Sequence, residues 1–409
     1  MKIEQAEKLK LPINGGIYGQ DHLAEHNFIN GDFVKYPFSV VIENINPSIG
    51  KSICKYPQTT QPEITRAIDS AREAFKSWKR LSRVKRAEYF NKVAQLIDDR
   101  REDIATVISL ETGKNYNESI AEVNEALHMA QYAFGSGRIP HGEVIASEIS
   151  EKDSYMLRKP KGVIAIVSPF NFPVAIGAFW CAAPALVEGN TVVLKPSEDA
   201  PMSSQICAEL YYEAGFPPGV FNVIHGDGKV GDALVHGDVD HICFTGSAEV
   251  GQHIRKVAAE SWHKTTSCEM GSKSACIIFD DVEYELSVPA AVASAFKLSG
   301  QRCVSSGRMI VQRNILNGFI AKFIEKASQL KKNQVESLHK NILSILNESL
   351  KFHGTTIMNF KFDNMKTGDY KEQLNVYGRV NKACNRCNFN IIKIKSAGRG
   401  TYLCKNCQK

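Results

Sequence analysis

The sequence lacks the features that mark secreted, repeat or fibrous proteins. Its first residues, Met-Lys-Ile-Glu-Gln-Ala-Glu-Lys, are not followed by an apolar segment, so no secretory signal is predicted. Neither an internal repeat nor a low-complexity linker occurs. Four of the eleven cysteines form two CxxC pairs, and the other seven are scattered among apolar runs without disulfide-framework spacing. Reduced thiols and a cytoplasmic location are therefore expected.

Charge is absent from one stretch that a hydropathy scan would flag. Residues 162–187 contain no charged side chain, but Pro169, Pro173 and Pro184 interrupt them. This pattern predicts a buried strand, a loop and a buried helix. No membrane span is expected.

Acidic residues are missing from position 374 onward, where eight basic residues occur. Residues 331–409 carry fifteen Lys/Arg and five Asp/Glu, a net charge of +10, against +6 for the 409-residue chain. The first 330 residues therefore carry −4. A basic block of this kind indicates a polyanion partner, nucleic acid above all, or only a solvated tail.

The apolar pattern predicts an α/β fold. Residues 62–78 and a second segment through Tyr89, Val93, Leu96 and Ile97 have helical periodicity. Four β-rich runs then alternate with helical stretches, at residues 163–167, 191–194, 220–224 and 241–244. Strands separated by helices of this length favour a doubly wound parallel sheet.

Several motifs follow one another along this half. They are Ile29-Asn30-Gly31-Asp32, Phe170-Asn171-Phe172-Pro173, Lys195-Pro196-Ser197-Glu198, Phe244-Thr245-Gly246-Ser247, Cys268-Glu269-Met270-Gly271 and Gly300-Gln301-Arg302-Cys303. Over about residues 28–330 the chain resembles the aldehyde dehydrogenase superfamily. The resemblance implies an NAD-binding domain followed by part of a catalytic domain.

This family oxidises an aldehyde through a covalent thiol adduct. The resemblance makes Cys303 the nucleophile, Asn171 an oxyanion donor together with the Cys303 backbone N–H, and Glu269 the base that activates water. Each residue also has a simpler interpretation. Cys303 could be a small buried hydrophobe, Asn171 a turn residue, and Glu269 a solvated residue at a strand end.

Residues at strand-to-helix turns indicate the cofactor side. Gly246 and Ser247 offer backbone N–H groups and a hydroxyl to a pyrophosphate, and Gly251 lets helix and sheet approach. The resemblance adds four positions to the cofactor site: Phe170, Lys195, Glu198 and Gly226. Because a carboxylate at Glu198 disfavours a 2′-phosphate, NAD is expected in preference to NADP.

Three departures from the family pattern stand out. Ser272 replaces a common glycine, and Trp180 stands where many relatives carry lysine. A Glu-x-Phe-Gly-Pro motif, which holds the nicotinamide ribose in the family, does not occur. We therefore expect an incomplete catalytic domain, and both retained and lost turnover stay open, as does formation of the family's oligomer.

The tail contains Cys384-x2-Cys387-x16-Cys404-x2-Cys407, a spacing typical of a structural zinc site. The simpler interpretation is a redox or unliganded cluster. Residues 337–409 resemble the C-terminal zinc finger of formamidopyrimidine-DNA glycosylases, with residues 338–352 as the preceding helix. The resemblance implies a zinc-ribbon hairpin whose Arg399 contacts DNA phosphates, although Arg399 could equally be a surface charge.

The glycosylase catalytic residues are absent, since the chain begins Met-Lys-Ile-Glu and not with a proline amine followed by Glu. Neither base excision nor lyase activity is expected. The predicted domains are residues 1–268, 269–332 and 333–409. Three hypotheses remain open: an aldehyde or semialdehyde dehydrogenase with an appended finger, a zinc-dependent DNA-binding module, and a non-functional chimera from a gene fusion.

Overall fold

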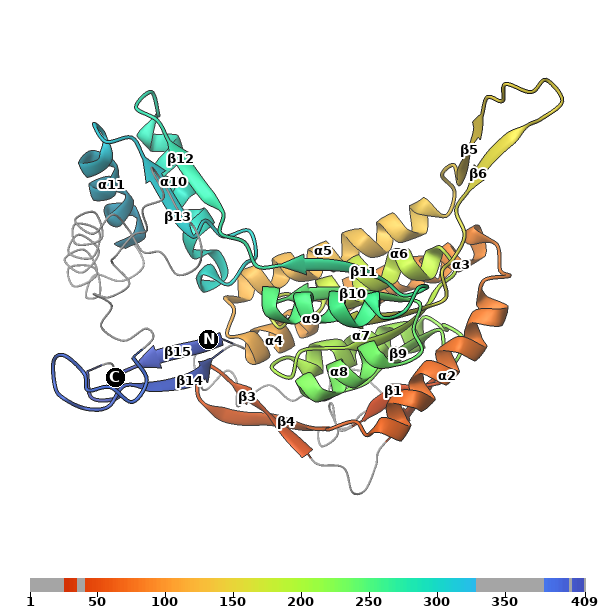
Figure 1. Ribbon diagram of the computed structural model, residues 1–409, viewed down its shortest axis with the longest axis horizontal. Coiled ribbons are helices and arrows are strands. Elements are labelled where there is room, and N and C mark those ends of the chain that lie inside the picture. The colour runs from red at the N-terminus through yellow and green to blue at the C-terminus, as the bar shows by residue number, and fades with distance from the viewer. Residues whose placement is uncertain (1–25, 35–40, 329–378, 397–398, 408–409) are drawn as a thin grey trace. The chain divides into compact units, whose positions relative to one another are not determined.

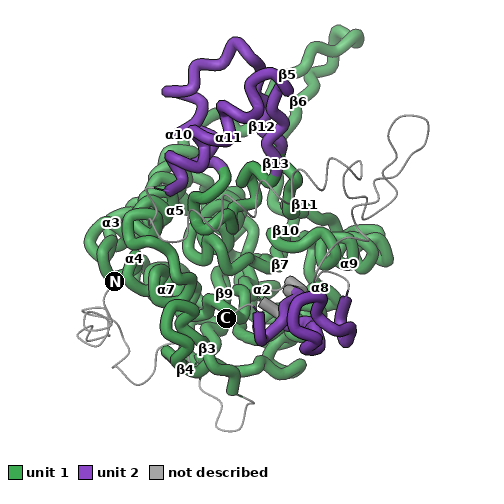
Figure 2. Tube along the Cα trace, turned by 90° about the vertical axis from the view of Figure 1, so that its left-hand side faces the viewer, with its two compact units in different colours: residues 1–274, 295–307 green, residues 275–294, 308–409 purple. Residues whose placement is uncertain are grey.

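A computed structural model describes residues 26–34, 41–328, 379–396 and 399–407. The chain divides into two compact units (Figure 2). Unit 1 contains residues 1–274 and 295–307, and unit 2 contains residues 275–294 and 308–409. The helix predicted over 338–352 and the junction predicted near Lys332 lie outside the described residues.

Unit 1 is built on a seven-stranded sheet in the order β11-β10-β7-β8-β9-β1-β2 (Figure 1). Five of these strands are parallel neighbours: β7 (Val163–Val167), β8 (Thr191–Lys195), β9 (Phe221–Val223), β10 (His241–Gly246) and β11 (Thr265–Met270). Two short antiparallel strands complete the β9 edge: β1 (Asn27–Ile29) and β2 (Asp32–Val34). The predicted parallel sheet is confirmed, and the antiparallel edge makes it mixed.

Helices cover both faces of this sheet. One face packs against α2 (Gln61–Trp78), α8 (Gly228–His236) and α9 (Ala248–Ala259). The other faces a layer formed by α3 (Arg83–Asp99), α4 (Arg101–Thr112), α5 (Tyr116–Ser136), the π-helix η1 (Ala175–Cys181), α6 (Ala182–Val187) and α7 (Pro201–Glu213). Each layer has its own apolar core against the sheet.

The burial of the strands explains why the sequence folds this way. All five residues of β8 are buried, as are the first four of β7, because helices cover both faces. The uncharged segment 162–187 forms β7, a loop, η1 and α6, as predicted. None of the helices that the structure describes combines the length and apolar character that crossing a membrane requires.

Two hairpins extend unit 1. The first pairs β3 (Val41–Asn46) with β4 (Lys51–Pro57), and a register shift falls between Asn44 and Ile45. The second pairs β5 (Gly142–Ile145) with β6 (Ser154–Leu157) and follows the end of α5 (Figure 1).

Unit 2 contains two small sheets. Strands β12 (Ala275–Ile278) and β13 (Arg308–Val311) are parallel and pack with α10 (Tyr284–Phe296) and α11 (Leu316–Ser328) around Ile278 and Phe319. Strands β14 (Ile392–Ser396) and β15 (Arg399–Leu403) form an antiparallel hairpin, with Ser396 opposite Arg399.

A buried carboxylate joins three elements of unit 1. Glu111, near the end of α4, accepts hydrogen bonds from Met202 N at 2.6 Å and Ser203 N at 2.8 Å. It also accepts bonds from the Ser203 hydroxyl and from Asn44 Nδ2 on β3. Glu111 therefore binds the first turn of α7, where backbone N–H groups lack helical partners. Burial nevertheless raises the pKa of Glu111 to about 7.

This raised pKa predicts a pH dependence of stability. The folded chain binds a proton at Glu111 up to about pH 7, whereas the unfolded chain releases it near 4.5. Stability from this group is thus fully present below pH 4.5 and falls as the pH rises through about 7. Glu111→Gln should remove a decline of roughly 2–3 kcal/mol, measured by urea unfolding between pH 5 and 8. Exposed Glu73→Gln is the control, and an unchanged pH slope in Glu111→Gln would contradict the prediction.

Candidate functional site

The segment before Cys303 has an unusual backbone. Leu298, Ser299 and Gly300 have φ values of +54°, +53° and +74°, in the left-handed region. Glycine tolerates this conformation, but a bulky side chain such as that of Leu298 rarely adopts it. Such backbones persist where surrounding contacts hold them, and they cluster at functional sites.

Cys303 lies exposed directly after this segment, within a turn closed by a 3.1 Å bond from Ser305 N to Arg302 O. Its accessibility contrasts with that of Cys207, which is fully buried and whose thiol pKa is raised by burial. The simpler interpretation of Cys303 as a small buried hydrophobe does not fit an exposed side chain. Exposure is what attack on a small electrophile requires.

Asn171 lies against the Cys303 segment although 130 residues separate them in sequence. It follows β7, is 9% exposed, and donates from Nδ2 to Gln301 O at 2.7 Å. Its Oδ1 is buried and has no hydrogen-bond partner among the described residues. This hydrogen bond therefore holds the Asn171 amide at Gln301, two residues before Cys303. A residue that only forms a local turn would not need such a long-range contact.

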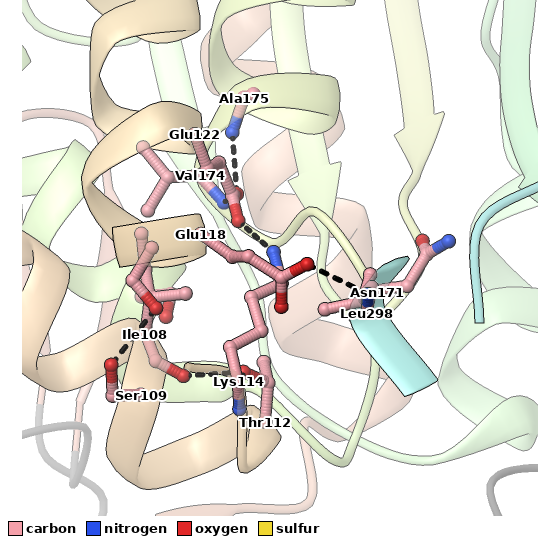
Figure 3. Close-up of polar contacts among 12 residues, drawn as sticks. Ile108, Ser109, Thr112, Lys114, Glu118, Glu122, Asn171, Val174, Ala175 and Leu298 are labelled. Atoms are coloured by element: carbon pink, nitrogen blue, oxygen red, sulfur yellow. Dashed lines mark hydrogen bonds and ion pairs between the residues drawn. The ribbon is translucent and has the colours of Figure 1, made fainter. Parts of the chain in front are cut away.

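A set of buried charged residues supports these segments, and the sequence motifs did not indicate it (Figure 3). Glu122 on α5 accepts hydrogen bonds from Val174 N at 2.8 Å and Ala175 N at 3.1 Å. The same carboxylate pairs with Lys114, and both side chains are almost completely buried. Burial raises the pKa of Glu122 and lowers that of Lys114, while their attraction opposes both changes.

One helical turn earlier on α5, Glu118 Oε1 accepts a hydrogen bond from Leu298 N at 2.9 Å (Figure 3). Lys114 Nζ also lies 4.2 Å from the centre of the Phe172 ring, a cation–π contact. The only sequence signal for these residues was a Lys/Glu pattern at helical spacing, which normally indicates an exposed helix face.

Glu269 lies on β11, opposite Thr245 of β10 in the parallel register. Its side chain is exposed, while its neighbours Cys268 and Met270 are partly buried. The carboxylate is therefore open to solvent, which is also what the simpler interpretation of a solvated residue near a strand end requires. Exposure alternates along β11 because successive side chains of a strand point to opposite faces of the sheet.

The predicted cofactor residues lie at the carboxyl edge of the parallel strands. Lys195 ends β8, Gly246 ends β10, and Phe170 and Gly226 follow β7 and β9. This edge is where doubly wound sheets bind nucleotides. These residues therefore share one edge of the sheet, because each of them ends or follows a parallel strand.

Lys195 and Glu198 form a pair at this edge. Lys195 is 3% exposed, and its Nζ lies 3.3 Å from Glu198 Oε2. Burial lowers the pKa of the Lys195 ammonium, and Glu198 opposes that change. Together they present an ammonium and a carboxylate, groups that can bind ribose hydroxyls.

Gly251 of α9 and Gly246 of β10 both lie close to side chains of the sheet. A Cβ placed on Gly251 would lie 2.5 Å from Met270 Sδ, and one placed on Gly246 would lie 2.5 Å from the Phe244 ring. Ser247 is the N-cap of α9 and accepts a hydrogen bond from Val250 N at 3.4 Å. Its hydroxyl proton remains available to a ligand at this helix N-terminus.

The four tail cysteines come together in unit 2. Their sulfur atoms all lie within 4.8 Å of one another, with Cys384 and Cys407 at 4.0 Å and Cys387 and Cys404 at 3.4 Å. The antiparallel β14–β15 strands separate the two CxxC pairs, and Arg386 N lies 3.5 Å from Cys384 Sγ. The arrangement can hold one tetrahedral metal ion, for which Zn–S bonds of about 2.3 Å require sulfur separations of about 3.8 Å.

Comparison with known proteins agrees with the geometry of unit 1. The sequence matches the aldehyde dehydrogenase family over residues 36–343. It is 34% identical to a malonate-semialdehyde dehydrogenase of Bacillus velezensis over 306 residues, 75% of this chain and 62% of the relative. It is 36% identical to an alpha-ketoglutaric semialdehyde dehydrogenase of Bacillus subtilis over 309 residues, 74% of this chain and 62% of the relative.

A solved structure gives the same result. A betaine aldehyde dehydrogenase double mutant from Staphylococcus aureus, in complex with NAD+, aligns with a TM-score of 0.72 at 34% identity. The alignment covers 76% of this chain and 62% of that one. The chain belongs to the aldehyde dehydrogenase family. It spans about 62% of the length of these relatives.

The buried Lys114–Glu122 pair predicts a large effect of breaking it. Glu122→Ala leaves an unpaired ammonium and two unsatisfied backbone N–H groups in the core. We expect a loss of about 3–5 kcal/mol in unfolding free energy, measured by urea denaturation. The double variant Lys114→Met with Glu122→Gln removes the charges and keeps an acceptor, so it should recover most of that loss. Equal destabilisation of both variants would show that the ion pair is not the cause.

Proposed function

We propose that the protein oxidises an aldehyde or semialdehyde to the acid with NAD, through a thioester on Cys303. The observation that carries this proposal is the 2.7 Å bond from Asn171 Nδ2 to Gln301 O, which holds this amide against the backbone two residues before the exposed Cys303. The semialdehyde substrate class is supported by the names of the relatives that the chain matches.

The chemistry begins at Cys303. Its thiolate attacks the aldehyde carbonyl carbon, and the resulting oxyanion is stabilised by the second N–H of the Asn171 amide and by the Cys303 backbone N–H. The cofactor that Gly246, Ser247, Lys195 and Glu198 would hold would supply the hydride acceptor for this carbon. Glu269 then removes a proton from water, which attacks the Cys303 thioester and releases the acid. The exposure of Glu269 is consistent with water reaching it.

The residues at the carboxyl edge of the sheet fit the cofactor. Gly246 leaves no Cβ at the end of β10, and the Ser247 hydroxyl stands at the N-terminus of α9, where a pyrophosphate is favoured. Lys195 and Glu198 would hold the adenosine ribose. Because Glu198 would repel a 2′-phosphate, we propose NAD and not NADP as the cofactor.

This proposal predicts the behaviour of two variants. With malonate semialdehyde or propanal as substrate, Cys303→Ala should reduce NADH formation to the uncatalysed background. Asn171→Ala should lower kcat by about a hundredfold, because one oxyanion donor is lost. NADH absorbance gives the rate, and Cys276→Ala on β12 is the control. NADH formation that persists in Cys303→Ala would contradict the proposed chemistry.

The cysteine cluster supports a second function, in which the tail binds structural zinc and contacts duplex DNA through its basic surface. Four thiolates within 4.8 Å suit a closed tetrahedral site with no open position for catalysis. From position 374 the tail carries eight basic residues and no acidic one, and Arg399 begins β15 at the hairpin turn. Phosphate contacts of this kind position a protein without reading sequence.

The zinc proposal predicts one bound zinc per chain, measured by atomic emission. Duplex DNA should bind at low salt, weaken as salt rises, and be released by a chelator, as followed by fluorescence anisotropy. Arg399→Ala should weaken binding with zinc retained. A chain without zinc would contradict the metal site, and duplex binding that chelation leaves unchanged would contradict the role of the finger.

A further inference from the structure

We propose that Glu118 and Glu122 of α5 are positioning residues that together set the distance between the Asn171 amide and the Cys303 thiol. This inference rests on the proposed function, because it assumes that Cys303 forms the adduct and that Asn171 stabilises it. The two carboxylates lie one helical turn apart on the same face of α5. Each accepts hydrogen bonds from the backbone of a different site segment (Figure 3).

Glu122 holds the Asn171 segment. Its Oε1 accepts hydrogen bonds from both Val174 N and Ala175 N, so the carboxylate fixes the backbone where η1 begins. Its Oε2 pairs with Lys114, whose ammonium also lies over the Phe172 ring. The turn between β7 and η1 is thus fixed on both sides of Pro173, and Asn171 has little freedom to shift.

Glu118 holds the Cys303 segment. Its Oε1 accepts a hydrogen bond from Leu298 N at 2.9 Å, the first of three consecutive residues with positive φ. Leu298 is 7% exposed, so most of this residue is withdrawn from water. Glu118 therefore supplies the contact that a left-handed leucine requires if it is to remain in that conformation.

The contacts close a ring. From α5 it passes through Glu122 to the segment at Val174, then through Asn171 Nδ2 to Gln301 O. It returns from Gln301 to Leu298 through a 2.9 Å turn bond, and from Leu298 through Glu118 to α5. Because all links attach to one helix, motion of either segment must stretch or break a hydrogen bond. Opening the ring at Glu118 should loosen the Cys303 segment without removing a reacting group.

The test measures adduct formation at Cys303 and does not depend on turnover. The full chain is alkylated with iodoacetamide at increasing propanal concentrations, and Cys303 modification is followed by peptide mass spectrometry. A reversible thiohemiacetal protects the thiol, which gives a half-protecting propanal concentration. We expect Glu118→Ala to raise this concentration about tenfold or more, because the oxyanion donor and the thiol are no longer held together.

Two further variants separate positioning from general stability. Glu118→Gln keeps an oxygen that can accept from Leu298 N, so it should remain within about threefold of wild type. Glu118→Asp keeps the charge but has a shorter reach, and should resemble Glu118→Ala. Gln131→Ala, at an exposed position of the same helix, is the matched control and should not change the protection.

The outcomes distinguish this inference from the function on which it rests. Wild-type Cys303 that propanal does not protect overturns the proposed function and this inference with it. Protection in the wild type that Glu118→Ala leaves unchanged overturns the positioning role alone. A Glu118→Gln variant as impaired as Glu118→Ala also overturns it, because the hydrogen bond would then not be the property that matters.

Discussion

Buried carboxylates require partners, and at Glu122 this requirement organises the site. Burying an ionised carboxyl group is costly unless it is paired or hydrogen-bonded, and Glu122 is bound to Lys114 and to two backbone N–H groups. These partners come from the loop between α4 and α5 and from the start of η1. The position of Asn171 is therefore a consequence of how one charge on α5 is neutralised.

The parallel sheet supplies the complementary constraint. Strands covered by helices on both faces cannot expose polar residues along their length, so the polar groups gather where the strands end. Lys195, Gly246 and Asn171 reach one edge for this reason. The Cys303 segment comes from much later in the chain, and it is bound to Asn171 at that edge and to Glu118 on α5. The sheet thus provides one half of the candidate site and the α5 carboxylates attach the other.

Much of the fold was predictable from periodicity, and less of the site was. Strand β7 and the end of α2 at Trp78 agree with the apolar pattern, because burial of that kind leaves a direct signal. Lys114, Glu118 and Glu122 gave no such signal, since charges at helical spacing normally face solvent. The left-handed Leu298 was equally hidden, because leucine rarely adopts that backbone. The surroundings of the three charged residues and the backbone conformation of Leu298 depend on contacts with residues that are distant in sequence.

The division of the chain into units has a further consequence for evolution and for protein engineering. The Cys303 segment belongs to unit 1 but is reached only after residues 275–294 of unit 2, and the chain then re-enters unit 2 at position 308. The two units therefore cannot be exchanged by a single recombination event. A crossover after position 274 would transfer the residues at the carboxyl edge of the sheet without the Cys303 segment, whereas a crossover after position 307 would transfer both.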